Sequence, residues 1–283
     1  MEMVETQTNP VPKAAEQRIA DLFSETATPH ARGNAARWYA EMFIELFLSD
    51  SAKVALGSEQ FKKLGLERKI DAIQNDTSPE TIATLQLIKS LGDRASHYSE
   101  VPFTEREAKR AVEAAGDLIV QVLLHELKTT PLNANEPRAK ILSVLFPSIR
   151  IRVLRELLET HERLNPYQAL LLHKYNLACV KNGQDKKARR ELDTLFKKRL
   201  IDRDFYDYQV RSIRVIADQR NLGTLPIAQR MEDVARNFKS VLEGLTPAEC
   251  EANAKLIAIL ETLIKDVLPS DLSEQVGDQI FIV

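Results

Sequence analysis

The sequence predicts an all-α protein, and three observations support this prediction. The 283 residues include only 9 Gly and 12 Pro, so few positions favour the tight turns that join β-strands. Long stretches carry apolar residues at the spacing of an amphipathic helix. Several of these stretches begin at Ser or Thr followed by Pro or an acidic residue, a pattern typical of a helix N-terminus.

Two domains are expected, because chains of this length usually divide into two cores of ordinary size. Residues 129–138 concentrate Pro, Asn and Thr between two strongly apolar periodic regions, which predicts the junction. The expected parts are a disordered tail at residues 1–12, a helical domain at 13–128, a second helical domain at 139–270 and a tail at 271–283.

Caps and helix breakers predict where the helices begin and end. The expected helices cover residues 37–50, 67–74, 79–92, 104–127, 139–146, 148–160, 166–181, 185–199, 205–220, 227–242 and 247–267. Ser78, Thr104 and Thr246 are the expected N-caps, the last two with a capping-box glutamate three residues on. Gly92 is expected to end its helix in a left-handed turn. In the first helix, Trp38 lies on an apolar stripe that we expect to face the core.

Charge and composition narrow the functional classes. The formal net charge is -2, so a nucleic-acid contact requires a local basic patch. Cys179 and Cys250 lie far apart and outside any CxxC pair, which predicts neither a disulfide framework nor a metal site. Without a leader-like start or a long apolar window, we expect a cytoplasmic protein with no membrane contact. Nucleotide-binding and hydrolase motifs are missing, and no cofactor is expected.

Residues 88–97 read Ile-Lys-Ser-Leu-Gly-Asp-Arg-Ala-Ser-His and stand before a long predicted helix. Arg37 and Glu41, four residues apart, lie in an earlier helix. This arrangement resembles the HEPN superfamily over residues 14–128. The resemblance implies a helical bundle that works as a homodimer, in prokaryotic RNA handling or antiphage defence. Some members of that superfamily are metal-independent endoribonucleases, and others have lost catalysis.

A catalytic role would fall on His97, Arg94 and Lys89. An imidazole can move a proton between the RNA 2′-hydroxyl and the leaving oxygen, while cations stabilise charge on the phosphate. The arginine of the family's catalytic pattern should stand at Ser90, Leu91 or Gly92, and none of these is basic. The sequence therefore leaves open whether the chain is an enzyme, and the other interpretation is a histidine that only holds a loop.

Residues 174–188 contain Tyr175, Leu177-Ala178, a turn at Asn182-Gly183 and Ala188. This pattern resembles one tetratricopeptide unit, in which small residues stand where two helices cross. The resemblance implies a helical-repeat-like second domain that binds a protein partner. A single legible unit leaves the existence of a true repeat array undecided.

Residues 181–203 carry nine basic and four acidic residues and are the best candidate for an RNA-binding surface. The alternative is a solvated helix face, since aromatic residues are not interleaved for base stacking. Arg150, Arg152 and Arg155 would extend the patch if they shared its face. The candidate RNA-binding residues are Lys186, Lys187, Arg189, Arg190, Lys197, Lys198 and Arg199.

The leading hypothesis is a HEPN-like protein that dimerises and binds RNA, a protein partner or both, with weak or no catalysis. One alternative is a metal-independent HEPN endoribonuclease that uses His97. The other is a noncatalytic helical scaffold or adaptor that binds no nucleic acid. The sequence does not identify the RNA substrate, the protein partner or the oligomeric state.

Overall fold

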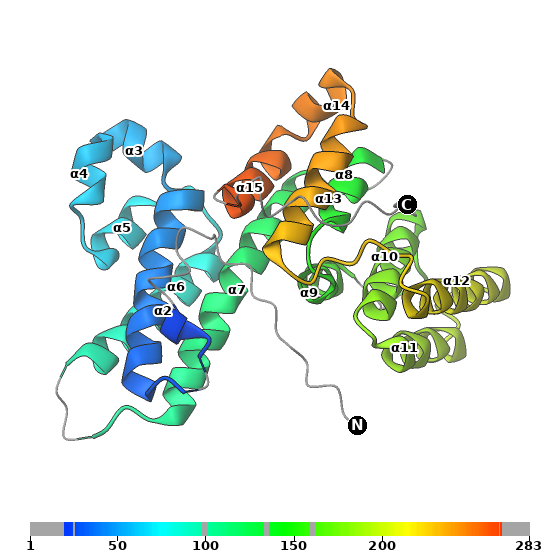
Figure 1. The fold of residues 1–283 in the computed structure, drawn as a ribbon, viewed down its shortest axis with the longest axis horizontal. Helices are drawn as coiled ribbons and strands as arrows, with labels where there is room; N and C mark the ends of the chain where they lie inside the picture. The colour runs from blue at the N-terminus through cyan, green and yellow to red at the C-terminus, as the bar shows by residue number, and fades with distance from the viewer. Residues whose placement is uncertain are drawn as a thin grey trace. The chain divides into compact units, whose positions relative to one another are not determined.

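A computed structural model describes residues 20–24, 26–97, 101–132, 136–158, 162–265 and 267. Helices account for most of these residues and no strand occurs among them, which confirms the all-α prediction (Figure 1). The predicted tails at residues 1–12 and 271–283 lie outside the described residues. Within the described ranges, no helix is long and apolar enough to cross a membrane.

The chain divides into two compact units, with the division between His125 and Glu126. The first unit contains the described residues up to His125 and the end of the last helix from Glu261. Its elements are η1 (Ala20–Leu22), α2 (Pro29–Phe43), the π-helical turn η2 (Ile44–Leu48), α3 (Asp50–Leu56), α4 (Ser58–Lys62), α5 (Leu66–Ala72), α6 (Pro79–Ser96) and most of α7 (Glu105–Thr129).

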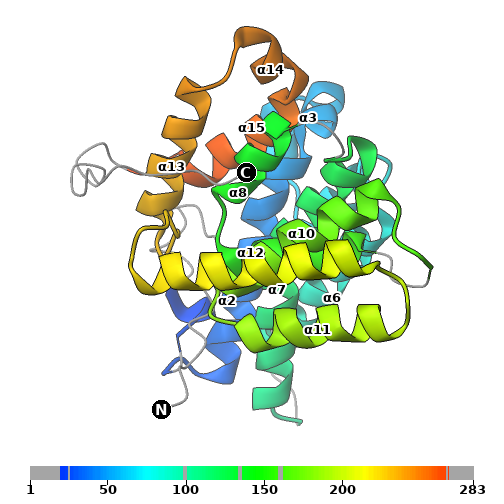
Figure 2. The same cartoon turned by 90° about the vertical axis from the view of Figure 1, so that its right-hand side faces the viewer.

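The second unit runs from Glu126 to Leu260. Its helices are α8 (Glu136–Ser143), α9 (Pro147–Leu157), α10 (Pro166–Lys181), α11 (Asp185–Lys197), α12 (Arg203–Asn221), α13 (Met231–Glu243), α14 (Pro247–Ala252) and most of α15 (Ala254–Ile264). Helices α9, α11 and α12 all pack against α10, and α11 lies beside α12 (Figure 2).

In the first unit, α2 and α6 pack closely side by side (Figure 1). A Cβ added at Gly33 would come within 2.5 Å of the Ala95 Cβ, and one at Gly92 within 2.6 Å of the Arg37 Cβ. These glycines are therefore needed because two helix backbones approach each other closely. The expected helix end at Gly92 was wrong, since α6 continues to Ser96 and only then turns at His97.

The apolar stripe expected in the first helix also needs correction. Trp38 is 56% exposed, whereas Ala36, Tyr39, Ala40 and Phe43 form the buried face of α2. The small residues on this face allow α6 to come close, so the contact follows them rather than the tryptophan. The helix also begins earlier than expected, at Pro29, with Thr28 as its N-cap.

The remaining boundaries agree in part with expectation. Ser78 accepts a hydrogen bond from the Thr81 N–H, and Thr104 and Thr246 form the predicted capping boxes with glutamates three residues on. The expected helix 247–267 is instead two helices. They are separated at the fully buried Asn253, whose side-chain amide donates to the Glu249 carbonyl. That bond competes with the regular helical ladder at the break.

Two basic side chains, Lys69 and Arg138, are almost fully buried and paired with carboxylates. Lys69 donates to Glu41 at 2.7 Å and to Glu45 at 2.6 Å in the first unit. In the second unit, Arg138 donates to Glu126 at 3.0 Å and to the Thr130 carbonyl. Each cation has a carboxylate that offsets the cost of removing its charge from water.

Candidate functional site

A polar cleft of about 490 Å³ lies in the first unit beside the crossing of α2 and α6. The segment from Lys63 to Arg68, where α5 begins, forms one wall. Arg37 of α2 and three residues of α6 or its end, Lys89, Asp93 and His97, form the rest of the lining. The three α6 positions follow one another at intervals of four, so one helix face presents them all.

Asp93 forms ion pairs with two of the basic residues that line this cleft. Its carboxylate pairs with the Arg37 guanidinium at 3.0 Å and with the Lys89 ammonium at 3.2 Å. Glu67 lies 3.5 Å from the same ammonium. The hydrogen bond to Asp93 raises the pKa of Lys89 above its ordinary value, so this lysine stays protonated. Arg37 and Lys89 are thus already accompanied by carboxylates.

The structure brings together two of the three residues proposed for catalysis. His97 and Lys89 both line the cleft. His97 is exposed, and its backbone N–H donates to the Asp93 carbonyl at the end of α6. Arg94 lies outside the lining, because its guanidinium pairs with Glu107 of the α7 capping box.

Arg37 is a cleft cation that was not predicted as a site residue from the sequence. It comes from α2, and Gly92 allows its Cβ to pack directly against the α6 backbone. A guanidinium therefore stands near Lys89 and His97 although none precedes His97 at the expected position in α6. The signal in the sequence was Gly92 itself, which marks a close approach rather than a helix end.

The second candidate surface is the exposed face of α11, which we call the α11 basic face. Lys186, Arg190 and Lys197 lie within about 40° of one another around the helix axis. The apolar residues Ala188, Leu192 and Leu195 lie on the opposite, buried side. The exposed cations of the face and the following turn are Lys186, Lys187, Arg190, Lys197, Lys198 and Arg199.

The carboxylates of α11 are paired with cations away from this face. Asp185 bonds Arg220 of α12 at 2.7 Å, and Glu191 pairs with Arg155 of α9. Asp193 accepts hydrogen bonds from Arg189 and the Tyr206 hydroxyl. Arg189 is therefore the one predicted RNA-binding residue of this helix that the described contacts tie into the fold.

Arg199 has a left-handed backbone with φ 58°, a conformation that glycine adopts at lower cost. It stands at the turn where α11 ends, and its side chain is exposed. The left-handed residue lets the Leu200 N–H donate to the Leu195 carbonyl, which closes the end of α11.

The three arginines expected to extend the patch do not do so as a group. Arg150 is only 7% exposed and lies inside the second unit. Arg155 is exposed but pairs with Glu191. The sequence missed the burial of Arg150, although its position four residues before the buried Leu154 placed it on the apolar face of α9.

The remaining reactive side chains, a cysteine and a histidine, are weaker candidates for a functional site. Cys179 is buried, and burial raises the pKa of its thiol, so it is a poor nucleophile. Burial also lowers the pKa of His173, which faces Gln209. Within the described parts of the chain, no group of three or more His, Cys, Asp or Glu side chains is arranged to hold a metal ion.

Comparisons with known proteins found no matching family model, no similar curated protein and no similar solved structure.

Proposed function

We propose that this chain is an RNA-binding protein that contacts the phosphate backbone through the α11 basic face. The observation that carries the proposal is the separation of charge on α11. Its carboxylates bond to Arg155, Arg189 and Arg220, while six cations of the helix and its C-terminal turn remain exposed. A surface of this kind attracts a polyanion even when the whole chain has a net charge near zero.

RNA retention by purified protein tests the proposal. The variant Lys186→Ala/Arg190→Ala/Lys197→Ala removes three cations from one side of α11. We expect its affinity for single-stranded RNA to fall by about 10-fold or more, and the slope of log affinity against log salt to become shallower by about 2.

A charge-matched control separates location from net charge. Arg106, Lys109 and Arg110 are exposed together on α7, so Arg106→Ala/Lys109→Ala/Arg110→Ala changes the net charge equally. We expect this variant to bind RNA like the unchanged protein. Equal losses in both variants, or no salt-dependent retention at all, would favour a scaffold or adaptor that binds no nucleic acid.

The proposal includes the HEPN-like class for the first unit, a homodimer, a cytoplasmic location and a role in prokaryotic RNA handling or antiphage defence. Its support is the resemblance around residues 88–97 and the position of Arg37 beside that segment. The helical hairpin of α10 and α11 supports a protein-partner site in the second unit. Light scattering at high protein concentration tests the dimer, and a strictly monomeric species would contradict it.

A second candidate function is metal-independent RNA cleavage in the cleft. The observation that favours it is the shared lining formed by Arg37, Lys89 and His97. His97 would transfer the proton of the RNA 2′-hydroxyl, and Arg37 would stabilise charge on the phosphate with a planar, bidentate group. RNA would have to displace Asp93 from Arg37, which costs part of the binding energy.

Cleavage assays in EDTA test this candidate with matched arginine variants. We expect His97→Ala and Arg37→Ala to abolish cleavage. Arg94→Ala should leave cleavage unchanged, because Arg94 pairs with Glu107 outside the cleft. Activity that survives His97→Ala would rule out the candidate.

A further inference from the structure

Helix α12 carries apolar residues on two of its sides. One side, which includes the buried Ile213 and Ile216, packs against α10 and α11 (Figure 2). On the outer side, Tyr208 is 49% exposed, Val215 is 51% exposed and Leu222 is 77% exposed. Single apolar residues are common on protein surfaces, but three on one side of one helix form a face that a second helix can cover.

The three exposed apolar residues follow one line along the helix. Each stands seven residues after the one before, which is nearly two helical turns, so their directions differ by only about 20° per step. Leu222 follows the last residue of α12 and keeps near-helical backbone angles of φ −81° and ψ −6°. We call Tyr208, Val215 and Leu222 the α12 stripe. Apolar residues repeated every seven positions are typical of a helix that pairs with another helix.

Two opposite charges flank the α12 stripe on the same side. Arg211 and Asp218 are both exposed, and neither side chain forms an ion pair or hydrogen bond with another described residue. They are seven residues apart, about 10 Å along the helix, so they do not reach each other within one chain. Each of them can therefore take a partner from another molecule.

A second copy of the same helix, running in the opposite direction, supplies those partners. If the two helices cross at Val215, two-fold symmetry places Tyr208 of each copy opposite Leu222 of the other. Arg211 of each copy then lies on the same side of the contact as Asp218 of the other copy, offset by one residue or about 1.5 Å. A parallel pair would instead place like charges at the same level along the helices.

We propose that the α12 stripe binds the α12 stripe of a second copy of this chain, in an antiparallel two-fold dimer with two Arg211–Asp218 ion pairs. The charges select a second copy as the partner, because one helix supplies both members of each pair. A contact confined to one helix from each copy lies at the low end of interface sizes, which predicts a weak dimer. The interface lies in the second unit, so it does not rest on the HEPN-like class of the first unit.

Sedimentation velocity of the full chain at about 1 µM to 1 mM tests the dimer. We expect a monomer–dimer equilibrium. Val215→Lys places two ammonium groups at the two-fold axis and should weaken the dimer by about 100-fold or more. Val54→Lys is the matched control, because Val54 is 88% exposed on α3 and the substitution is the same. This control should dimerise like the unchanged protein.

Charge exchange tests the antiparallel register. Arg211→Glu and Asp218→Arg each place like charges opposite one another twice, so each variant alone should dimerise about 10-fold more weakly or worse. In an equimolar mixture, the mixed dimer pairs opposite charges at both positions, so the mixture should dimerise like the unchanged protein. All the substituted side chains are exposed, and circular dichroism checks that every variant folds.

Three results would overturn the proposal. The first is a monomer over the whole concentration range. The second is unchanged dimerisation of Val215→Lys, which would leave the homodimer of the proposed function in place but on another surface. The third is a mixture of the charge variants that dimerises no better than either variant alone. RNA retention by the α11 basic face is measured separately, so the RNA-binding proposal and this interface fail independently.

Discussion

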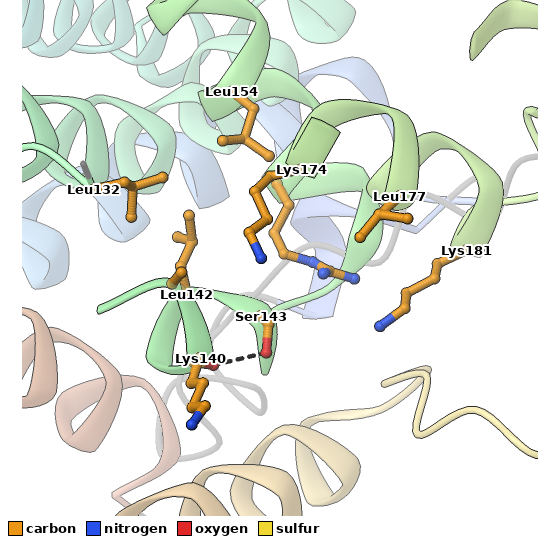
Figure 3. A pocket seen from close by; sticks show the side chains of 10 residues that line it. Leu132, Lys140, Leu142, Ser143, Leu154, Lys174, Leu177 and Lys181 are labelled. Carbon is orange, nitrogen blue, oxygen red and sulfur yellow. Dashed lines mark hydrogen bonds between the residues drawn. The ribbon is translucent and has the colours of Figure 1, made fainter. Parts of the chain in front are cut away.

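The cleft of the first unit and the pocket of the second both gather basic side chains, but they differ in what accompanies the charge. In the cleft, Asp93 bonds to both Arg37 and Lys89. In the pocket of the second unit, which lies among α8, α9 and α10 (Figure 3), Arg150 and Lys181 meet no acidic residue of the described lining. Burial and repulsion from Arg150 lower the pKa of Lys181 to about 7, whereas the hydrogen bond to Asp93 raises the pKa of Lys89. A carboxylate at bonding distance therefore decides whether a lysine among other cations keeps its ordinary charge.

Two buried arginines of the second unit differ in the same way, because only one of them has a carboxylate partner among the described residues. Arg138 bonds to the buried Glu126 and to a backbone carbonyl. Arg150 is nearly as buried, but among the described residues no carboxylate pairs with its guanidinium. The first arginine has its burial offset by a carboxylate, and the second does not.

The largest effect on the free energy of unfolding is expected when each of these two arginines is replaced in turn. Arg138→Met leaves the Glu126 carboxylate buried and unpaired, so the free energy of unfolding should fall by about 3 to 5 kcal/mol. Arg150→Met removes a buried charge that no described carboxylate offsets, and should be neutral or stabilising. Urea titrations measure both. Equal destabilisation by the two changes would show that Arg150 is also a structural ion.

The next effect concerns the crossing that positions Arg37 in the cleft. Gly92→Ala places a Cβ 2.6 Å from the Arg37 Cβ, and neither atom can move without its backbone. Overpacking of this kind should lower the free energy of unfolding by about 1 to 3 kcal/mol. Gly244→Ala is the control, because its Cβ would make only ordinary contacts. Urea midpoints measure both, and equal effects would contradict a tight crossing.

Gly92 also shows where prediction from sequence stops. The N-caps at Ser78, Thr104 and Thr246 were predicted correctly because their partners lie three residues along the chain. A glycine can either end a helix or admit a neighbouring backbone, and only the distant helix α2 decides between these uses. Nearby residues in the sequence were therefore enough to predict where these helices begin. They were not enough to predict where α6 ends.

The candidate sites also differ in whether they could be predicted from the sequence. The exposed cations of α11 could be predicted because one helix presents them with its own periodicity. The pocket could not, since Ser143, Arg150 and Lys181 come from three helices that meet only in the folded chain. What the sequence did contain was Arg150 on the apolar face of α9, a sign that charge would be buried there.

A smaller effect is expected from pH. Below about pH 7, Lys181 is protonated in both states, and the folded protein bears the full cost of the buried charge. From about pH 7 to 9 the folded state releases this proton and the unfolded state keeps it, so the unfolded state binds more protons and stability rises with pH. We expect a gain of about 2 kcal/mol over this window.

Lys181→Met should remove this gain, because it takes away the titrating group. The comparison uses urea titrations of both proteins at pH 7 and pH 9. Parallel pH profiles for the two proteins would mean that Lys181 has an ordinary pKa and is not confined among like charges.

The smallest change in stability, and the most direct test of the comparison, comes from Asp93→Asn. Asp93 and Arg37 are each about one-third exposed on their side chains, so losing the pairs should cost less than about 1 kcal/mol. The substitution leaves Arg37 and Lys89 without their shared carboxylate. Urea titrations of the variant and the unchanged protein measure the loss. A loss as large as that of Arg138→Met would contradict the comparison, because a partly exposed ion pair would then stabilise the fold as much as a buried one.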